Sequence, residues 1–359
     1  MAKRPPQAVP GRGARSNPDN RFEATRRELI DDGWGSLDAP PPPLTTTLTV
    51  DSSRSVISYN TSPDVPFDRS INPYRGCEHG CVYCFARPTH AYLDLSPGLD
   101  FESKLFYKPN AAELLRNELA KRNYRCQPIT VGINTDAYQP VERKLGVTRQ
   151  ILEVLRDCHH PLTIVTKSAL IERDLDILAP MAARNLVHVA VSITTLDHRL
   201  ARRLEPRAAA PKRRLQTIAT LSEAGIPVTV LVAPLIPVLT DNELETILEQ
   251  VRQAGARDAG YVLLRLPLEI KTLFKEWLVE HEPGKADHVM NRIRDSRGGK
   301  EYDAAFGQRM RGTGIFADLI AQRFKLAKKR LGFAGTPQLD TQQFCPPTPV
   351  NHSGQLALF

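Results

Sequence analysis

Three cysteines in one short segment form the group of residues with the clearest chemistry. Cys77, Cys81 and Cys84 lie in the run NPYRGCEHGCVYCF, where Gly76 and Gly80 allow the backbone to approach a bound group closely. Thiolates at this spacing can wrap one face of a cubane iron–sulfur cluster, and a fully ligated 4Fe-4S cluster usually takes four cysteines. The spacing therefore predicts a 4Fe-4S cluster that leaves one iron open to a small-molecule ligand.

A zinc knuckle is the alternative for the same three thiols. Zinc ligands usually come as two paired hooks, and the sequence contains no second CxxC-like hook. A single fourth ligand would have to come from elsewhere in the chain. The candidates are Cys126, Cys158, Cys345, His79 and His90. Cluster ligation is therefore the favoured interpretation, and disulfides are disfavoured in a reducing cytoplasm.

The segments that must position this loop alternate between two patterns. Short β-branched runs typical of buried strands occupy residues 129–133, 162–166, 187–193, 228–232 and 261–266. Helical spacing occupies residues 111–122, 148–158, 171–184, 212–224 and 242–254. With a further strand expected just before Cys77, about six β/α units fit, which predicts a parallel sheet covered by helices. The predicted fold class is α/β, a partial (β/α)6 barrel with its chemistry at the carboxyl ends of the strands.

Composition divides the chain into four predicted segments. Residues 1–65, rich in Pro, Ser, Thr and Arg, are expected to form a mostly disordered basic arm with one short helix near residues 21–31. The barrel is expected over residues 66–270, and residues 271–334 are expected to form a helical C-terminal extension that could cap its open side. Helical spacing there covers residues 268–281, 286–295 and 315–331. Residues 335–359 are expected to be a flexible tail.

The cysteine motif resembles the radical S-adenosylmethionine (SAM) superfamily. The resemblance covers about residues 69–270 and includes the aromatic Tyr83 before the last cysteine. It implies that Cys77, Cys81 and Cys84 ligate the cluster, that the open iron chelates the amino and carboxylate groups of SAM, and that Tyr83 lies near the adenine. It also implies reductive cleavage of SAM to methionine and a 5′-deoxyadenosyl radical that abstracts hydrogen from a substrate. An electron donor such as flavodoxin or ferredoxin is the implied partner.

Two further stretches are similar to the spore photoproduct lyase-like branch, the SplB-like DNA repair photolyases. They are GINTDAYQPVE at residues 132–142 and RLEPR at residues 203–207. The lyase relays hydrogen through a cysteine after the second strand and through tyrosines around the last cluster cysteine, where this chain has Asn134 and Phe85. Cys126 cannot substitute, because it lies as far as about 26 Å of extended chain from Asn134, at the other end of the strand. The resemblance therefore implies a photolyase-like enzyme without the known relay.

Polar residues near the carboxyl ends of strands are candidates for holding SAM. Asn134, Thr135 and Asp136 after the second strand could instead form an Asx turn, and the pair ending the strand at residues 187–193 could instead cap the next helix. Two arginines could pair with the SAM carboxylate or lie on a solvated helical face. The six candidates are Asn134, Thr135, Ser192, Thr194, Arg203 and Arg207.

The net charge of the chain indicates which kinds of partner it could bind. The 48 Lys and Arg against 40 Asp and Glu give a net charge of +8. A positive net charge favours binding of polyanions but does not identify any one polyanion as a partner. The loop at residues 199–214 holds seven basic residues and the single acid Glu205, so nucleic acid is a candidate partner and a solvated face is the alternative. The N-terminus shows no secretory signal, and the longest apolar stretch, residues 228–239, is shorter than the ~20 residues of a membrane span. A cytoplasmic location without membrane contact is expected.

The predicted function is radical SAM chemistry on an unidentified substrate, with nucleic acid as one candidate. One alternative is a radical SAM enzyme that modifies a protein or a small molecule. The other is a zinc-stabilised nucleic-acid-binding protein without catalysis. Cys158 is expected to be structural because it lies near the end of a predicted helix, and Cys345 is a poor candidate ligand.

Overall fold

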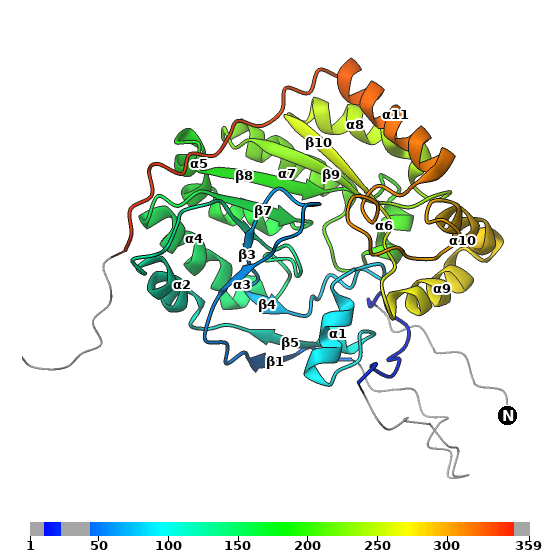
Figure 1. Ribbon diagram of the computed structural model, residues 1–359, viewed down its shortest axis with the longest axis horizontal. Helices are drawn as coiled ribbons and strands as arrows, with labels where there is room; N and C mark the ends of the chain where they lie inside the picture. Colours follow the sequence, from blue (N-terminus) through cyan, green and yellow to red (C-terminus); the bar gives the residue numbers. More distant parts are fainter. Residues whose placement is uncertain (1–10, 23–43, 348–359) are drawn as a thin grey trace, which may run out of the picture.

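The computed structural model describes residues 11–22 and 44–347, and its centre is a mostly parallel sheet covered by helices (Figure 1). The strands run in the order β10-β9-β8-β7-β6-β3-β2, and all neighbours are parallel except β2 and β3. The bounds are β2 (Ile57–Tyr59), β3 (Arg69–Ile71), β6 (Ile129–Val131), β7 (Leu162–Thr166), β8 (Val187–Ser192), β9 (Val228–Leu235) and β10 (Asp258–Leu263). The α/β partial barrel predicted from the sequence is confirmed.

Helices connect the successive parallel strands, and they bury the apolar faces that the sequence pattern indicated. In α4, for example, Ile151, Leu152 and Leu155 are fully buried in the main core. Burial of one apolar face is what keeps such a helix on the sheet. The connecting helices are α2 (Ala111–Leu119), α3 (Glu142–Leu145), α4 (Val147–Asp157), α5 (Leu175–Ala183), α6 (His198–Leu204), α7 (Pro211–Glu223) and α8 (Leu244–Gln253).

A second, small sheet lies beside the barrel, in the order β1-β5-β4. It pairs β1 (Thr47–Val50) with β5 (Lys104–Tyr107), and β5 with β4 (Tyr74–Arg75). Strands β1 and β2 fall inside the segment that the sequence assigned to a disordered arm. All four residues of β1 are exposed, so this strand lacks the alternation that signals a strand, and its partner lies more than fifty residues away. Residues 1–10 and most of the short helix expected at residues 21–31 lie outside the described residues.

The C-terminal extension is helical, with α9 (Ile270–His281), α10 (Ala286–Asp295) and α11 (Gly314–Arg330). Helices α9 and α10 share a second hydrophobic core with the cysteine loop and α6, in which Phe274 and Trp277 are fully buried. Helix α11 packs on α8 and on β10 instead. Figure 1 shows α9 and α10 at one end of the barrel and α11 along the β10 edge.

A segment between α10 and α11 links the two edges of the main sheet. We call residues 303–311 the strap. At the β10 edge, Leu263 N donates to Met310 O over 2.9 Å. At the other edge, Gly307 N donates to Asp64 over 2.6 Å, and Asp64 also pairs with Arg309. Because Asp64 lies in the loop between β2 and β3, the strap spans the open side of the barrel.

The described part of the tail, residues 335–347, also differs from the flexible tail expected from its composition. Asp340 N donates to Asn185 O and Cys345 N donates to Cys158 O, each over 2.9 Å. Phe344 packs against Tyr124 and His160, with ring centroids 5.5 and 5.2 Å away. Two backbone hydrogen bonds and one aromatic anchor in a turn-rich sequence thus hold this segment against the barrel.

The described helices include none with the length and apolar character that crossing a bilayer requires.

Candidate active site

The cysteine loop follows β4 and is fixed by backbone hydrogen bonds to two distant segments. Cys77 N donates to Phe101 O over 2.9 Å, and Val82 N donates to Leu204 O over 3.1 Å. Cys77 and Cys81 are buried, Cys84 is half-buried, and all are free thiols. Gly80 has φ +68°, and a Cβ there would stand 2.7 Å from the Glu102 carboxylate. The loop therefore requires glycine at this position.

A buried arginine holds the outer side of the loop. The Arg87 guanidinium is fully buried, pairs with Glu102 over 2.5 Å, and donates to the backbone oxygen of Cys81 over 2.9 Å. Glu102 in turn accepts hydrogen bonds from Gly13 N and Ala14 N, over 3.0 and 2.8 Å. The N-terminal residues 11–22 therefore lie directly against the cysteine loop. Sequence reasoning missed this pair, because its members belong to no recognised motif.

The segment after β6 holds the inner side of the loop. Gln139 donates to Gly76 O over 3.1 Å and accepts from Glu78 N over 2.8 Å. Thr135 Oγ1 donates to Tyr74 O over 2.7 Å, so this candidate SAM ligand is engaged with the backbone before the loop. Asn134 beside it is exposed, and its backbone N–H donates to Asn72 over 2.9 Å. The GINTDAYQPVE stretch therefore supports the cysteine loop.

Asp136 in the same stretch is a carboxylate with a side chain only 9% exposed, and it joins three segments. It accepts from Tyr138 N over 2.9 Å, which is the Asx turn considered as an alternative for this stretch, and from Lys167 N over 2.7 Å. It also lies 3.3 Å from His79 Nδ1. Burial by itself raises its pKa, but His79 and the hydrogen bonds from Lys167 N and the Thr166 hydroxyl outweigh it and hold the pKa of Asp136 at about 2.

A buried network follows the ends of β8 and α6. The Tyr83 hydroxyl lies 3.0 Å from Thr194 Oγ1 and donates to Glu205. Glu205 also accepts from Thr194 over 2.7 Å and pairs with Arg214, whose guanidinium donates to Ser192 O over 2.9 Å. The structure thus brings Tyr83, Ser192 and Thr194 together. Asp197, and neither Ser192 nor Thr194, caps α6.

Charge in this network is set by its burial and its two cations. Burial opposes ionisation of Glu205, but Arg214 and Lys167 lower its pKa to about 2. Burial and the Glu205 charge raise the pKa of Tyr83 well above its usual value, so this phenol stays neutral. Glu205 stood out in the sequence as the only acid of a basic loop. That isolation was the signal for its pairing with Arg214.

Of the two arginine candidates, only Arg207 lies beside the cysteine loop. Its guanidinium is 3.2 Å from Glu78, whereas Arg203 pairs with Glu282 over 2.8 Å and donates to His281 O at the end of α9. Helix α6 ends at Leu204, so the two arginines do not share the helical face that the sequence suggested. Arg203 is therefore corrected from a SAM-carboxylate candidate to a residue that holds α9.

The thiols fit an iron–sulfur group by their chemistry. Burial raises the pKa of Cys81 to about 12 and that of Cys77 well above its usual value. Buried thiols of this kind become thiolates when a metal binds them. Across the part of the chain that is described, no three His, Cys, Asp or Glu side chains gather closely enough for one metal ion. A cubane cluster does not need such close ligands, because it is larger than one ion.

Three of the candidate fourth ligands of the zinc alternative already contact other groups. His79 faces Asp136, and His90 lies 3.0 Å from Lys104 O with its ring against Phe101. Cys158 belongs to the main core, where its carbonyl oxygen accepts a hydrogen bond from the tail, so its expected structural role matches its position.

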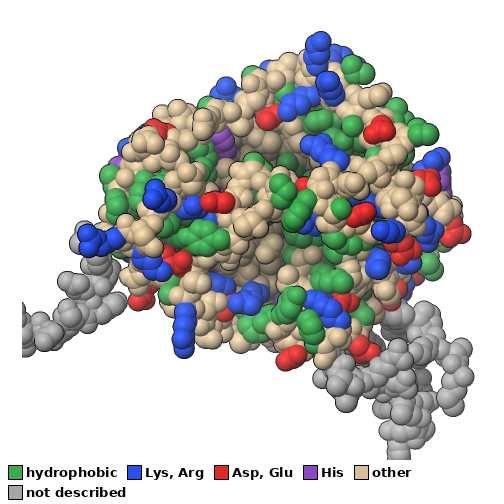
Figure 2. All heavy atoms as spheres, in the orientation of Figure 1, with side chains coloured by type: hydrophobic (Ala, Val, Ile, Leu, Met, Phe, Trp, Pro, Cys, Tyr) green, Lys and Arg blue, Asp and Glu red, His purple; other side chains and the backbone are tan. Residues whose placement is uncertain are grey.

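The molecule is hollowed at its centre, and both hydrophobic and basic side chains surround this opening (Figure 2).

Comparison with known proteins agrees with this geometry. The family model described as the Radical SAM superfamily matches residues 71–251, half of the chain. An uncharacterized protein of Mycobacterium tuberculosis is 39% identical over 221 residues, which are 61% of this chain and 65% of that protein. The match thus spans less than two thirds of that relative. An uncharacterized protein of Methanocaldococcus jannaschii is 28% identical over 62% of this chain and 79% of its own length.

Solved structures show the same fold. Spore photoproduct lyase complexed with dinucleoside spore photoproduct superimposes with a TM-score of 0.57 at 14% identity, over 80% of both chains. A variant of that lyase with bound AdoMet and dinucleoside spore photoproduct gives the same TM-score at 13% identity, also over 80% of both chains. With the cysteine motif, the barrel and the family match together, the chain belongs to the radical SAM superfamily, which uses a 4Fe-4S cluster and SAM.

Proposed function

We propose that this protein is a radical SAM enzyme of the photolyase-like group that acts on nucleic acid. The observation that carries the proposal is the junction of two features. The loop of three free thiols is connected through Tyr83 to the polar ends of β8 and α6. A metal-binding loop and a buried polar network thus meet at the carboxyl ends of parallel strands, where such barrels carry out their chemistry.

Each part of this junction has a proposed role. Cys77, Cys81 and Cys84 hold the cluster, which, when bound with SAM, supplies the electron that cleaves SAM and releases a 5′-deoxyadenosyl radical. When SAM is bound, Tyr83 would contact its adenine, and Ser192 and Thr194 would hold its ribose or its carboxylate. The role of Glu205 and Arg214 is to hold these groups in place, since both are buried and mutually paired. Helices α9 and α10 exclude water from the rear of the loop.

The reaction we propose differs from photoproduct repair by the known relay. Asn134 follows β6 and is exposed, and Phe85, which follows the last cluster cysteine, is 41% exposed. Neither side chain carries a hydrogen that a carbon radical readily abstracts and returns, as a thiol or a phenol does. Reduced enzyme with SAM is therefore expected to leave spore photoproduct in DNA unrepaired. Robust repair would contradict this part of the proposal.

Nucleic acid is the proposed substrate because of the basic surface near the site. In the loop at residues 199–214 several arginines are already paired, among them Arg213 with Glu172 and Arg214 with Glu205. Arg199, Arg202 and Lys212 are exposed and form no ion pair with any described residue. An Arg199→Gln/Lys212→Gln variant is therefore expected to bind DNA and RNA more weakly than the wild type. Equal binding by the variant and the wild type would favour the alternative substrate class, a protein or small molecule.

An electron donor such as flavodoxin or ferredoxin is proposed to reduce the cluster.

The deciding experiment measures both the cofactor and the reaction. Anaerobically prepared protein is expected to contain about four irons with sulfide and a brown colour. Under reduction it is expected to release 5′-deoxyadenosine from SAM, and Cys81→Ala is expected to abolish this release. One zinc per chain, no colour and no SAM cleavage would instead support the zinc-stabilised nucleic-acid-binding alternative.

A further inference from the structure

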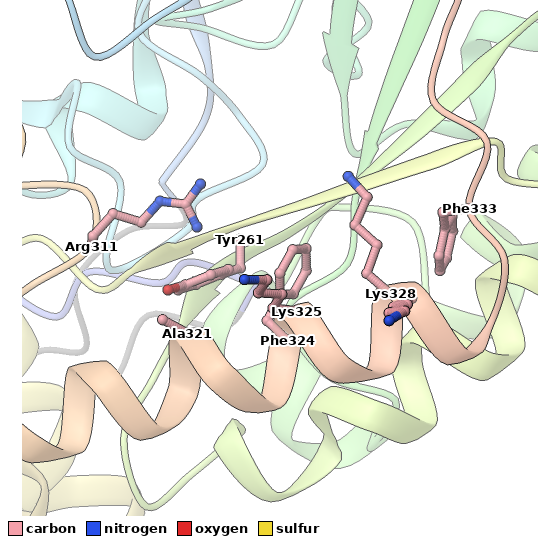
Figure 3. A pocket seen from close by; sticks show the side chains of 8 residues that line it. Tyr261, Arg311, Ala321, Phe324, Lys325, Lys328 and Phe333 are labelled. Atoms are coloured by element: carbon pink, nitrogen blue, oxygen red, sulfur yellow. The ribbon is translucent and has the colours of Figure 1, made fainter.

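A second candidate site lies on the outer face of the barrel, between β10 and α11. It is a pocket of about 400 Å³ with an aromatic floor and a basic rim (Figure 3). Tyr261, Phe324 and Phe333 form the floor. Arg311, Lys325 and Lys329 are at the rim. None of these residues takes part in the cysteine loop or in the Tyr83 network.

The rim carries positive charge that the described residues do not neutralise. Lys328 beside it pairs with Asp258 over 2.5 Å and donates to Ala259 O over 3.1 Å. Its neighbours along α11, Arg323 and Arg330, pair with Glu245 and Glu249. By contrast, Arg311, Lys325 and Lys329 are exposed and pair with no carboxylate anywhere in residues 11–22 or 44–347. The uncompensated cations of α11 are therefore those that face the pocket.

Tyr261 gives an independent sign of a missing ligand. Its side chain is only 3% exposed, and its hydroxyl has no hydrogen-bond partner among the described residues. The ring is held from two sides, by Phe324 with centroids 4.8 Å apart and by the Arg311 guanidinium 4.3 Å from its centroid. Figure 3 shows Arg311 and Tyr261 side by side, with the hydroxyl near Ala321, another lining residue. A buried hydroxyl without a partner indicates a group that the pocket normally accepts.

Contacts connect this pocket to the proposed active site. Arg311 follows Met310, whose sulfur lies 3.5 Å from the Arg265 guanidinium. Arg265 in turn lies over the exposed Phe85 ring, 5.4 Å from its centroid. Phe85 follows the cluster ligand candidate Cys84. Arg311, its chain neighbour Met310, Arg265 and Phe85 thus lead in sequence from the pocket to the cysteine loop.

We propose that this pocket binds the phosphate backbone of a single-stranded nucleic acid and directs the strand toward Phe85. The proposal rests on the proposed function, whose substrate it makes specific. Unpaired cations beside aromatic rings are the features with which proteins bind single strands, through phosphates and stacked bases. Lys325 and Lys329 lie four residues apart on α11, about 6 Å along the helix, so they can contact neighbouring phosphates. The Tyr261 hydroxyl donates to a phosphate oxygen at the base of the pocket.

The test measures binding of fluorescein-labelled oligo(dT) and oligo(rU) of about 16 nucleotides to the holoenzyme by anisotropy at several salt concentrations. Lys325→Gln/Lys329→Gln is expected to weaken binding about tenfold. The slope of the logarithm of the association constant against the logarithm of the salt concentration is expected to become less steep by about 1.4, which corresponds to the loss of two phosphate contacts on a single strand. The matched control is Arg292→Gln/Arg330→Gln, which removes the same charge from exposed, paired residues outside the pocket. An equal loss in the control pair would overturn the proposal.

A second variant tests the pocket without changing its charge. Tyr261→Phe is expected to weaken oligonucleotide binding several-fold and to leave the unfolding midpoint unchanged, because the hydroxyl has no partner among the described residues. Unchanged affinity in Tyr261→Phe would overturn the assignment. Inorganic phosphate and dTMP are the competitors that separate a strand from a free nucleotide. If dTMP binds as tightly as the oligonucleotide, the pocket is a nucleotide site and the strand proposal fails.

Release of 5′-deoxyadenosine from SAM without oligonucleotide separates this inference from the proposed function. The Lys325→Gln/Lys329→Gln variant is expected to cleave SAM as the wild type does, because it touches neither the loop nor the Tyr83 network. SAM cleavage without pocket-dependent strand binding would refute only this inference. Pocket-dependent binding without SAM cleavage would refute only the proposed function.

Discussion

At the scale of single residues, two buried ion pairs position the cysteine loop. Arg87 with Glu102 fixes the backbone of Gly80 and Cys81 from outside, and Arg214 with Glu205 fixes Tyr83 from inside. All four charged side chains are almost inaccessible to solvent. Removing one partner of such a pair leaves an uncompensated charge in the interior.

Glu205→Gln is therefore expected to lower the free energy of unfolding by about 3–5 kcal/mol, because it leaves the buried Arg214 without its counter-charge. Urea denaturation followed by circular dichroism measures the change. Glu249→Gln is the matched control, since its pair with Arg330 is exposed and contributes about 0–1 kcal/mol. Equal effects of the two substitutions would show that Glu205 is not part of a structural pair.

Thr135→Val separates support of the loop from contact with SAM. The substitution keeps the shape of the side chain and removes the hydrogen bond to Tyr74 O, leaving a buried carbonyl without this partner. The expected cost is about 1–3 kcal/mol of unfolding free energy, with the Kd for SAM unchanged in the folded holoenzyme. Thr135→Ser, which keeps the hydroxyl that donates to Tyr74 O, serves as the control for both measurements. Weaker SAM binding at unchanged stability would instead indicate that Thr135 contacts SAM directly.

At the scale of elements, periodicity explains what the sequence could predict. The helix predicted over residues 286–295 is α10, and the strand predicted over residues 162–166 is β7. Strand β1 was missed because all its residues are exposed, and β4 is only two residues long. The pairing of Arg87 with Glu102 and the position of Gln139 depend on tertiary contacts, which a local pattern does not encode.

The small sheet depends on Asp51, which joins the end of β1 to the other two strands. Its carboxylate accepts from Arg75 in β4 over 2.8 Å and binds Lys108, which follows β5. Burial raises its pKa, but the hydrogen bonds from Lys108 and Ser53 prevail and lower the pKa from 3.8 to about 2. The folded state thus holds this proton less tightly than the unfolded chain does.

A lowered pKa gives a defined pH dependence. The stabilisation from Asp51 is fully present above about pH 4, the unfolded pKa, and is lost as the pH falls toward about 2. Asp51→Asn is expected to destabilise the protein by about 1.5–3 kcal/mol at neutral pH. The difference from the wild type is expected to shrink as urea unfolding is repeated at successively lower pH. A difference that stays constant down to about pH 2 would contradict this assignment.

At the scale of the whole molecule, segments from both ends of the chain complete a barrel that its strands leave open. Residues 11–22 lie against the cysteine loop, and the strap joins the β10 edge to the loop between β2 and β3. The same strap carries Arg309 and Arg311, which lie over Phe306 and Tyr261. The strap therefore both spans the open side and contributes to the second pocket.

Asp64→Asn is expected to loosen the strap on the β2 side, where the hydrogen bond from Arg309 to Ser62 remains unchanged, and to leave the barrel folded. The substitution weakens the acceptor of Gly307 N and removes the charge that pairs with Arg309, whereas the hydrogen bond between Leu263 N and Met310 O remains. Hydrogen exchange followed by mass spectrometry is expected to show faster exchange in residues 303–309 and unchanged exchange in β7 and β8, because opening of the strap exposes no strand of the main core. Asp295→Asn, which breaks an exposed pair with Arg292 on α10, is the control. Faster exchange throughout the barrel would mean that the strap is part of the cooperative core, and unchanged exchange at the strap would mean that Asp64 does not hold it.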